Sequence, residues 1–114
     1  MSIELNNKYG SIIISPEIIA EVAENATKQC YGIIGLTGKP AKSFAGLLKP
    51  AKGIGVADSP EGVTVDLYVI IQYGVNMVAV AENVMDSVKF QIESQLNLQV
   101  VDVNVHIEQV RISQ

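Results

Sequence analysis

The sequence predicts an α+β fold, a two-layer sandwich in which a mixed sheet carries two helices on one face, in the order β-α-β-β-β-α-β. Several segments alternate apolar and polar residues or are rich in β-branched residues, which is typical of strands. Two other segments place apolar residues at helical spacing. The length of 114 residues allows one domain with one core. We therefore expect a single domain over residues 1–114, with an ordered core at about 8–112.

The first third of the chain predicts a strand, a helix and a second strand. Gly10–Ile14 is a β-branched run that favours a strand. Ser15 and Pro16 then favour a helix start, because a serine side chain can accept a hydrogen bond from a free N–H and proline suits the first helical position. We expect this helix at about residues 16–30 and a short strand at Gly32–Leu36, whose first glycine is a natural helix stop.

The middle of the chain predicts two strands joined by a turn and then a long helix. Gly53–Asp58 and Gly62–Tyr73 are the strands, and the Ser-Pro-Glu between them suits a hairpin turn. Asn76 is a good N-cap for a helix of about 20 residues, roughly 30 Å long, which Asn97 can close.

The last strand is predicted from Leu98 to about Ile112. Its apolar residues occupy odd positions at first and even positions at Val110 and Ile112. Since side chains alternate between the two faces of a sheet, this change predicts a bulge or an exit from the sheet near Gln109.

The composition excludes several classes of protein. The chain is 48% hydrophobic with a net charge of −4, which argues against disorder, and a single cysteine excludes a disulfide scaffold. The acidic balance argues against DNA binding. The longest uncharged run, Leu67 to Ala81, is shorter than the roughly 20 residues of a spanning helix, so we expect no direct membrane insertion.

The charge is unevenly distributed along the sequence. The segment from Lys39 to Lys52 holds four of the eight basic residues and no acidic residue, which leaves the rest of the chain with a net charge of −8. Clustered lysines attract anionic lipid head groups or acidic proteins. We therefore consider the following lysines as candidate contacts for a partner or an anion: Lys39, Lys42, Lys49 and Lys52.

The residues offer little for catalysis or for a metal. Cys30 is expected at the C-terminal end of the first helix, where the helix dipole disfavours a thiolate. One cysteine and one histidine, His106, cannot supply a common zinc ligand set. Asp66 and Asp102 share a predicted sheet face, but acid–base catalysis would also need a cleft. The sequence predicts no enzyme, no cofactor and no metal.

Three segments closely resemble the alkaline shock protein (Asp-twenty-three/Gls-twenty-four) family of Gram-positive bacteria. They are VDLYVIIQYGVN at residues 65–76, VAENV at 80–84 and VVDVNVHI at 100–107. The resemblance implies a cytoplasmic protein of the envelope or alkaline stress response, without established catalytic activity. Some members associate with the membrane through a separate anchor protein, and some self-assemble. We therefore expect a non-enzymatic scaffold or adaptor with a protein partner, either a membrane-anchored protein or a second copy of the chain, and a place in the cytoplasm or at the inner face of the membrane.

Two surfaces are candidate sites for these functions. If the helices cover one sheet face, the opposite face is open to self-association, and its predicted residues are Tyr68, Ile70, Asn104 and His106. The alternative is RNA binding by a KH-like module, in which Gly32–Gly35 would form the GxxG loop and Lys39–Lys52 would supply charge. The two isoleucines between these glycines suit a buried strand, and the lysines have no aromatic stacking platform near them. Both observations favour a protein-binding scaffold over RNA binding.

Overall fold

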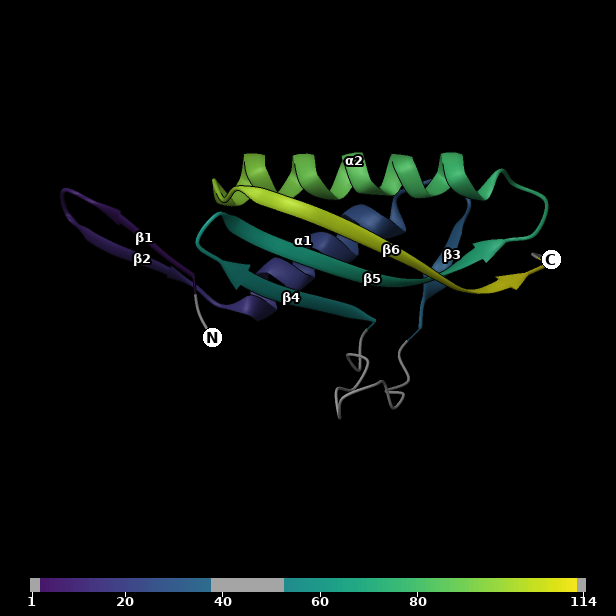
Figure 1. Cartoon of the computed structure of the whole chain (residues 1–114), viewed down its shortest axis with the longest axis horizontal. Helices are drawn as coiled ribbons and strands as arrows, with labels where there is room; N and C mark the ends of the chain where they lie inside the picture. The colour runs from purple at the N-terminus through teal and green to yellow at the C-terminus, as the bar shows by residue number, and fades with distance from the viewer. Residues whose placement is uncertain (1–2, 38–52, 113–114) are drawn as a thin grey trace.

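The computed structural model describes residues 3–37 and 53–112 (Figure 1). In these residues the chain forms six strands and two helices. They are, in order, β1 (Ile3–Asn7), β2 (Gly10–Ile14), α1 (Pro16–Lys28), β3 (Ile33–Leu36), β4 (Ile54–Ser59), β5 (Gly62–Gln72), α2 (Met77–Leu96) and β6 (Val100–Arg111).

Strand β5 is the centre of a mixed sheet. Residues 63–72 of β5 pair in parallel with β6, so β6 runs along almost the whole of one edge of β5. The antiparallel partners β4 and β3 pair with residues 62–67 and 69–71 of β5, so they follow one another along the other edge. The parallel pairing is possible because α2 carries the chain back between β5 and β6.

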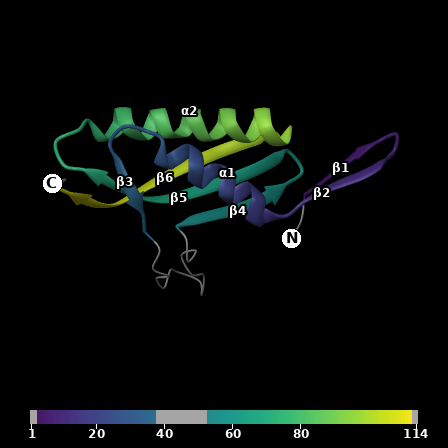
Figure 2. The same cartoon turned by 180° about the vertical axis from the view of Figure 1, so that it is seen from behind.

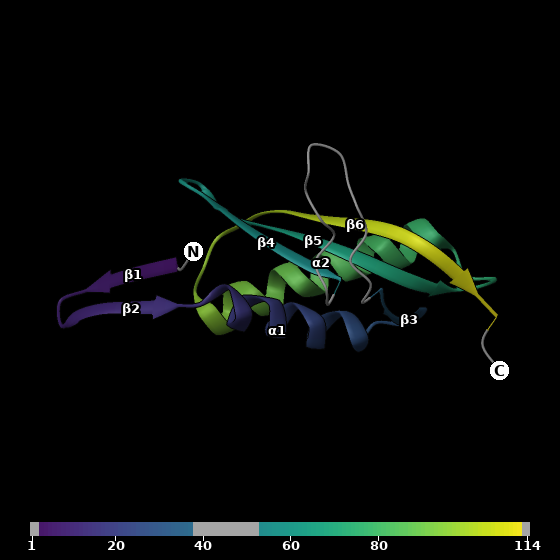
Figure 3. The same ribbon diagram turned by 90° about the horizontal axis from the view of Figure 1, so that it is seen from below.

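Both helices cover one face of this sheet, and within residues 3–37 and 53–112 no helix lies on the opposite face (Figure 3). The core lies between the two layers. The alternating positions of β5 that face the helices are buried, as is one stripe of α2, and both sets are apolar: Val63, Val65, Leu67, Val69 and Ile71 on β5, and Val80, Val84, Val88 and Ile92 on α2. The predicted two-layer α+β fold with two helices on one face is confirmed.

Local signals in the sequence predict the ends of α2 better than the start of α1. The Asn76 side chain accepts a hydrogen bond from the Ala79 N–H at 3.0 Å, and Asn97 closes α2 in the left-handed conformation at φ 57°. Ser15 is the N-cap residue of α1, but its side chain makes no capping hydrogen bond. The first helix therefore relies on Pro16 at its first position and on burial of its apolar face.

The predicted bulge in the last strand is confirmed. Val69 pairs with Ile107, whereas Ile70 pairs with Gln109, so Glu108 is the additional residue in β6. Beyond it, Val110 lies beside Ile71 on the helix side of the sheet. This explains why the apolar residues of the strand change from odd to even positions.

The first strand of the sequence prediction does not belong to the main sheet. Gly10–Ile14 is a strand, but it pairs in antiparallel fashion with β1, a strand that was not predicted from the sequence. The resulting hairpin projects from one end of the molecule (Figures 1 and 2). The chain measures 52 × 32 × 21 Å and is elongated along the hairpin. The order of elements is therefore β-β-α-β-β-β-α-β.

The helices of the described residues give no indication of a membrane span. Neither α1 nor α2 combines the length and the apolar character that crossing a bilayer requires.

Candidate interaction site on the open sheet face

Four side chains form a connected group on the helix-free face of the sheet. The parallel register places Asp66 of β5 beside Asn104 of β6, and Tyr68 of β5 beside His106 of β6. We call these four residues the polar cluster. Three of them were predicted from the sequence as part of an open face, and the structure brings them together across two strands.

The polar cluster is held by short contacts around one carboxylate. The Asp66 Oδ1 atom accepts a hydrogen bond from Asn104 Nδ2 at 3.1 Å and lies 3.1 Å from His106 Nε2. The Tyr68 and His106 rings are stacked, with centroids 4.3 Å apart and planes inclined by 10°. The side chains of His106 and Asp66 are 41% and 33% exposed. The cluster is therefore ordered before any partner binds, yet accessible to one.

The backbone fixes the position of Tyr68 where β3 and β4 meet. The Tyr68 N–H donates to the Gly53 carbonyl at 2.8 Å, and the Tyr68 carbonyl accepts from the Thr37 N–H at 2.9 Å. Thr37 directly follows β3, and Gly53 directly precedes β4. The ends of both edge strands therefore hold the central strand at the residue whose ring stacks on His106.

The structure changes the predicted composition of the open face at Ile70. This residue pairs with Gly35 and Gln109 and is only 7% exposed, so it offers little surface to a partner. Asp66 is the cluster member that the sequence prediction of the open face left out. Strand alternation places it on the same face as Tyr68, but its contacts with β6 depend on a register that the sequence does not show.

The basic segment and the proposed GxxG loop have different outcomes. Lys39, Lys42, Lys49 and Lys52 lie outside the described residues. Of the sequence Gly32–Gly35, the last three residues belong to strand β3, which pairs with β5. A KH loop clamps a nucleic-acid backbone from an exposed turn, so this arrangement gives RNA binding no support.

The groups considered for catalysis do not converge. Cys30 is buried in the core on the helix side, where its thiol donates to the Ala26 carbonyl at 3.3 Å. Asp102 lies beside Thr64, whereas Asp66 is engaged by Asn104 and His106. In residues 3–37 and 53–112, no three His, Cys, Asp or Glu side chains are grouped so that they could hold a metal ion.

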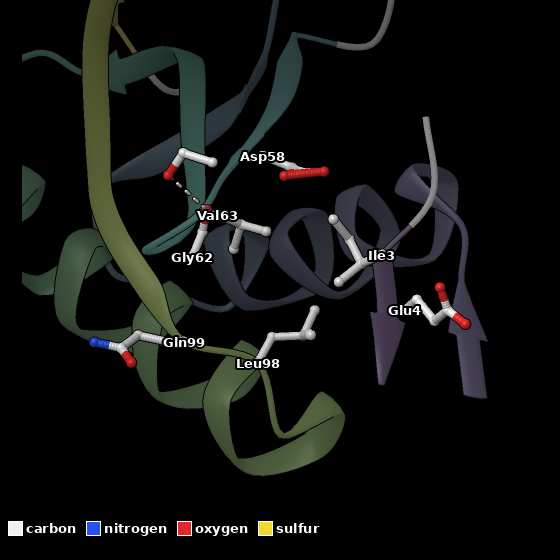
Figure 4. Close-up of a pocket in the computed structure, with 8 residues that line it drawn as sticks. Ile3, Glu4, Asp58, Gly62, Val63, Leu98 and Gln99 are labelled. Atoms are coloured by element: carbon white, nitrogen blue, oxygen red, sulfur yellow. Dashed lines mark hydrogen bonds between the residues drawn. The ribbon is translucent and has the colours of Figure 1, made fainter. Parts of the chain in front are cut away.

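A cavity of about 250 Å³ lies between the hairpin and the main sheet (Figure 4). Its apolar residues include Ile3, Val63 and Leu98. The side chains of Glu4 and Gln99 point in opposite directions, so they do not converge on a common ligand (Figure 4). The cavity is lined by residues of both the hairpin and the main sheet.

The fold and the polar cluster define a small two-layer α+β domain that presents an ordered polar surface on an open sheet. Residues 4–112 match the Asp-twenty-three family, which is described as having a cell envelope-related function. The chain belongs to this family, and the resemblance seen in its sequence is thereby confirmed.

The relatives include proteins of similar length from two genera. The chain is 37% identical to the uncharacterized protein YloU of Bacillus subtilis (strain 168), covering 99% of this chain and 98% of YloU. It is 34% identical to the uncharacterized protein Spy1614 of Streptococcus pyogenes serotype M6, covering 98% of this chain and 97% of Spy1614. It is 27% identical to the uncharacterized protein YqhY of Bacillus subtilis, covering 86% of this chain and 75% of YqhY. No solved structure matches the chain at a significant level.

Proposed function

We propose that this protein is a non-enzymatic adaptor of the envelope or alkaline stress response, which binds a protein partner through the polar cluster on its open sheet face. The partner is a second copy of the chain or a membrane-anchored protein. Through such a partner the chain would act in the cytoplasm or at the inner face of the membrane. The cell envelope-related function of the family supports this cellular role.

The observation that carries the proposal is the ordered, half-exposed state of the polar cluster. A histidine and an aspartate that only stabilised the fold would be expected in a satisfied, buried network. Here Asn104 and His106 both contact Asp66 Oδ1, while about two-fifths of the His106 side chain remains exposed on a face that neither α1 nor α2 covers. Tyrosine is enriched at protein interfaces because its ring offers apolar contact area and its hydroxyl offers a hydrogen bond.

The experiment compares one substitution at Tyr68, which is partly exposed, and at Tyr31, which is exposed outside the polar cluster. Tyr68→Glu places a carboxylate beside Asp66 and removes the ring stacked on His106. Tyr31→Glu is the matched control, because Tyr31 is exposed in the turn after α1, among residues that line a cavity at the start of α2. Sedimentation velocity over a concentration series would be measured for the wild type and both variants, with circular dichroism to verify folding.

Self-association through the polar cluster predicts that Tyr68→Glu forms oligomers only at higher concentrations than the wild type and Tyr31→Glu do. Identical profiles for all three proteins would exclude self-association through this face. Binding to a membrane-anchored protein is then tested with the same pair of variants. Wild type and Tyr31→Glu should be retained by the envelope fraction of the source cells, and equal retention of Tyr68→Glu would contradict the proposed surface.

A further inference from the structure

The hairpin formed by β1 and β2 is an arm whose outer half lies outside the core. Ile3 and Ile14 at its base and Leu5 at its midpoint pack against the core cluster. On β2, Ile12 and Ile13, the partners of Leu5 and Glu4, are 51% and 65% exposed. In all three views of the chain the arm extends beyond the helices and the main sheet (Figures 1–3).

Two strands alone form a poor sheet. An isolated hairpin is marginally stable in water, and three or more strands with an apolar face are usually needed for stability. The arm has two strands, and it pairs with no strand of the main sheet in the described residues. Pairing with a further strand would therefore stabilise the arm.

The two free edges of the arm differ in composition. Strand β2 (Gly10–Ile14) contains no charged residue and no proline, which are the usual devices that protect an edge strand from pairing. Strand β1 contains Glu4 and ends in two asparagines. The outer edge strand β6 of the main sheet carries Asp102, Glu108 and Arg111, as well as two register shifts. Of these three edges, β2 offers the least resistance to a new strand.

We propose that β2 pairs in antiparallel fashion with β2 of a second copy of this chain, with Ile12 on the two-fold axis. All five residues of the strand can pair only in this register, in which Ile12 faces Ile12 of the second copy and Gly10 faces Ile14. The two hairpins then form one four-stranded sheet. This interface lies on the arm, does not use the polar cluster and goes beyond the proposed function.

The chemistry of β2 favours a second copy as the occupant. Pairing β2 with itself brings no charges together, since the strand carries none. It places isoleucines beside each other and beside Leu5, which is the β1 partner of Ile12, so apolar area on one sheet face is removed from water. A contact of five residues on each side is smaller than a standard interface of about 1,600 Å², so the dimer is expected at high protein concentration.

The first test places the same charge on the two strands of the arm. Ile13→Lys puts a lysine on the proposed interface strand, at an exposed position where the fold does not need the isoleucine. Asn6→Lys adds the same charge on the same face of the hairpin but on β1, so it is the control, although it also removes the hydrogen bond that Asn6 accepts from Ser11. We expect wild type and Asn6→Lys to share one dimerisation curve in sedimentation equilibrium, and Ile13→Lys to weaken dimerisation at least about tenfold. A monomeric wild type, or equal curves for both variants, would overturn the proposal.

The second test reports the register directly. Opposite residues of antiparallel strands have Cβ atoms about 4.5–5.5 Å apart, so Ile12→Cys should form a disulfide with its copy under mild oxidation. Asn6→Cys lies on β1, one strand away from the interface, and should form at least tenfold less of the intermolecular disulfide. The native Cys30 is buried, and the wild type gives the background. Cross-linking of both variants to the same extent would overturn the proposed register. The proposal would also be overturned if adding Tyr68→Glu to Ile12→Cys abolished the disulfide, because the contact would then belong to the open face.

Discussion

Replacing Gly53 by alanine tests the argument that the ends of β3 and β4 fix the polar cluster. Gly53 has φ +77°, a conformation that costs a residue with a side chain about 1–2 kcal/mol. A Cβ atom built on Gly53 lies 2.7 Å from the Thr37 carbonyl oxygen, so the backbone of the two strand ends must move apart. Such overpacking adds about 1–3 kcal/mol. The expected loss in the free energy of unfolding is therefore about 2–5 kcal/mol.

Gly74→Ala separates the two contributions. Gly74 has a similar positive φ of +95°, but a Cβ atom there meets nothing within 4 Å. This variant should lose only the conformational part, about 1–2 kcal/mol. With a urea m-value of about 2 kcal/mol/M, the midpoint of Gly53→Ala should fall below that of Gly74→Ala by roughly 1 M.

The assay is urea unfolding followed by circular dichroism, combined with NMR of the only histidine. Movement of the strand ends should displace Tyr68, whose N–H donates to the Gly53 carbonyl, and thereby change the ring-current shift of His106. Gly74→Ala should leave this shift unchanged. Equal midpoints for the two variants would refute the reasoning, because they would show that contact with Thr37 has no energetic consequence.

Three further predictions concern caps, core and cluster. Asn76→Ala should lower the free energy of unfolding, measured in urea, by about 1 kcal/mol because it removes the hydrogen bond from the Ala79 N–H. Ser15→Ala should lower it by less than about 0.5 kcal/mol because the Ser15 side chain makes no capping bond. Equal losses for the two variants would contradict this difference. Leu67→Ala, fully buried at the centre of β5, should cost about 2–5 kcal/mol by the same measurement, and a loss below 1 kcal/mol would contradict its place in the core. Asp66→Ala should lower the free energy of unfolding by at most about 1 kcal/mol, since the pair of Asp66 with His106 is partly exposed. The NMR signals of His106 should shift clearly in this variant, and unchanged signals would contradict the contact.

Some features were predictable because they depend on neighbours in the sequence. The asparagines at both ends of α2 act within one helical turn, and the hairpin of β4 and β5 depends on its own turn residues. The bulge at Glu108 was visible within β6 as a change in the parity of apolar positions. In contrast, Ser15 has the right residue type for a cap but makes no capping bond, because residue type gives a capacity to bond and not the bond itself.

Other errors arose where the prediction required contacts between distant segments. Strand β1 is short and ends in two asparagines, so its pattern is weak, and its pairing with β2 gives that strand a place outside the main sheet. Ile70 has the strand parity of an exposed residue but is buried beside Gly35 and Gln109. Parity assigns a side chain to a face of the sheet, but it does not give the exposed area.

The sequence by itself determined the two-layer class, the helices, the strands of the main sheet and the membership of the Asp-twenty-three family. Only the tertiary structure decided that Asp66 meets Asn104 and His106. The strands β5 and β6 are joined across a 20-residue helix, and any shift of two residues in their register keeps the same side chains on the same face. The alternation of residues is therefore compatible with several registers, and packing of α2 against the sheet selects the one that forms the polar cluster.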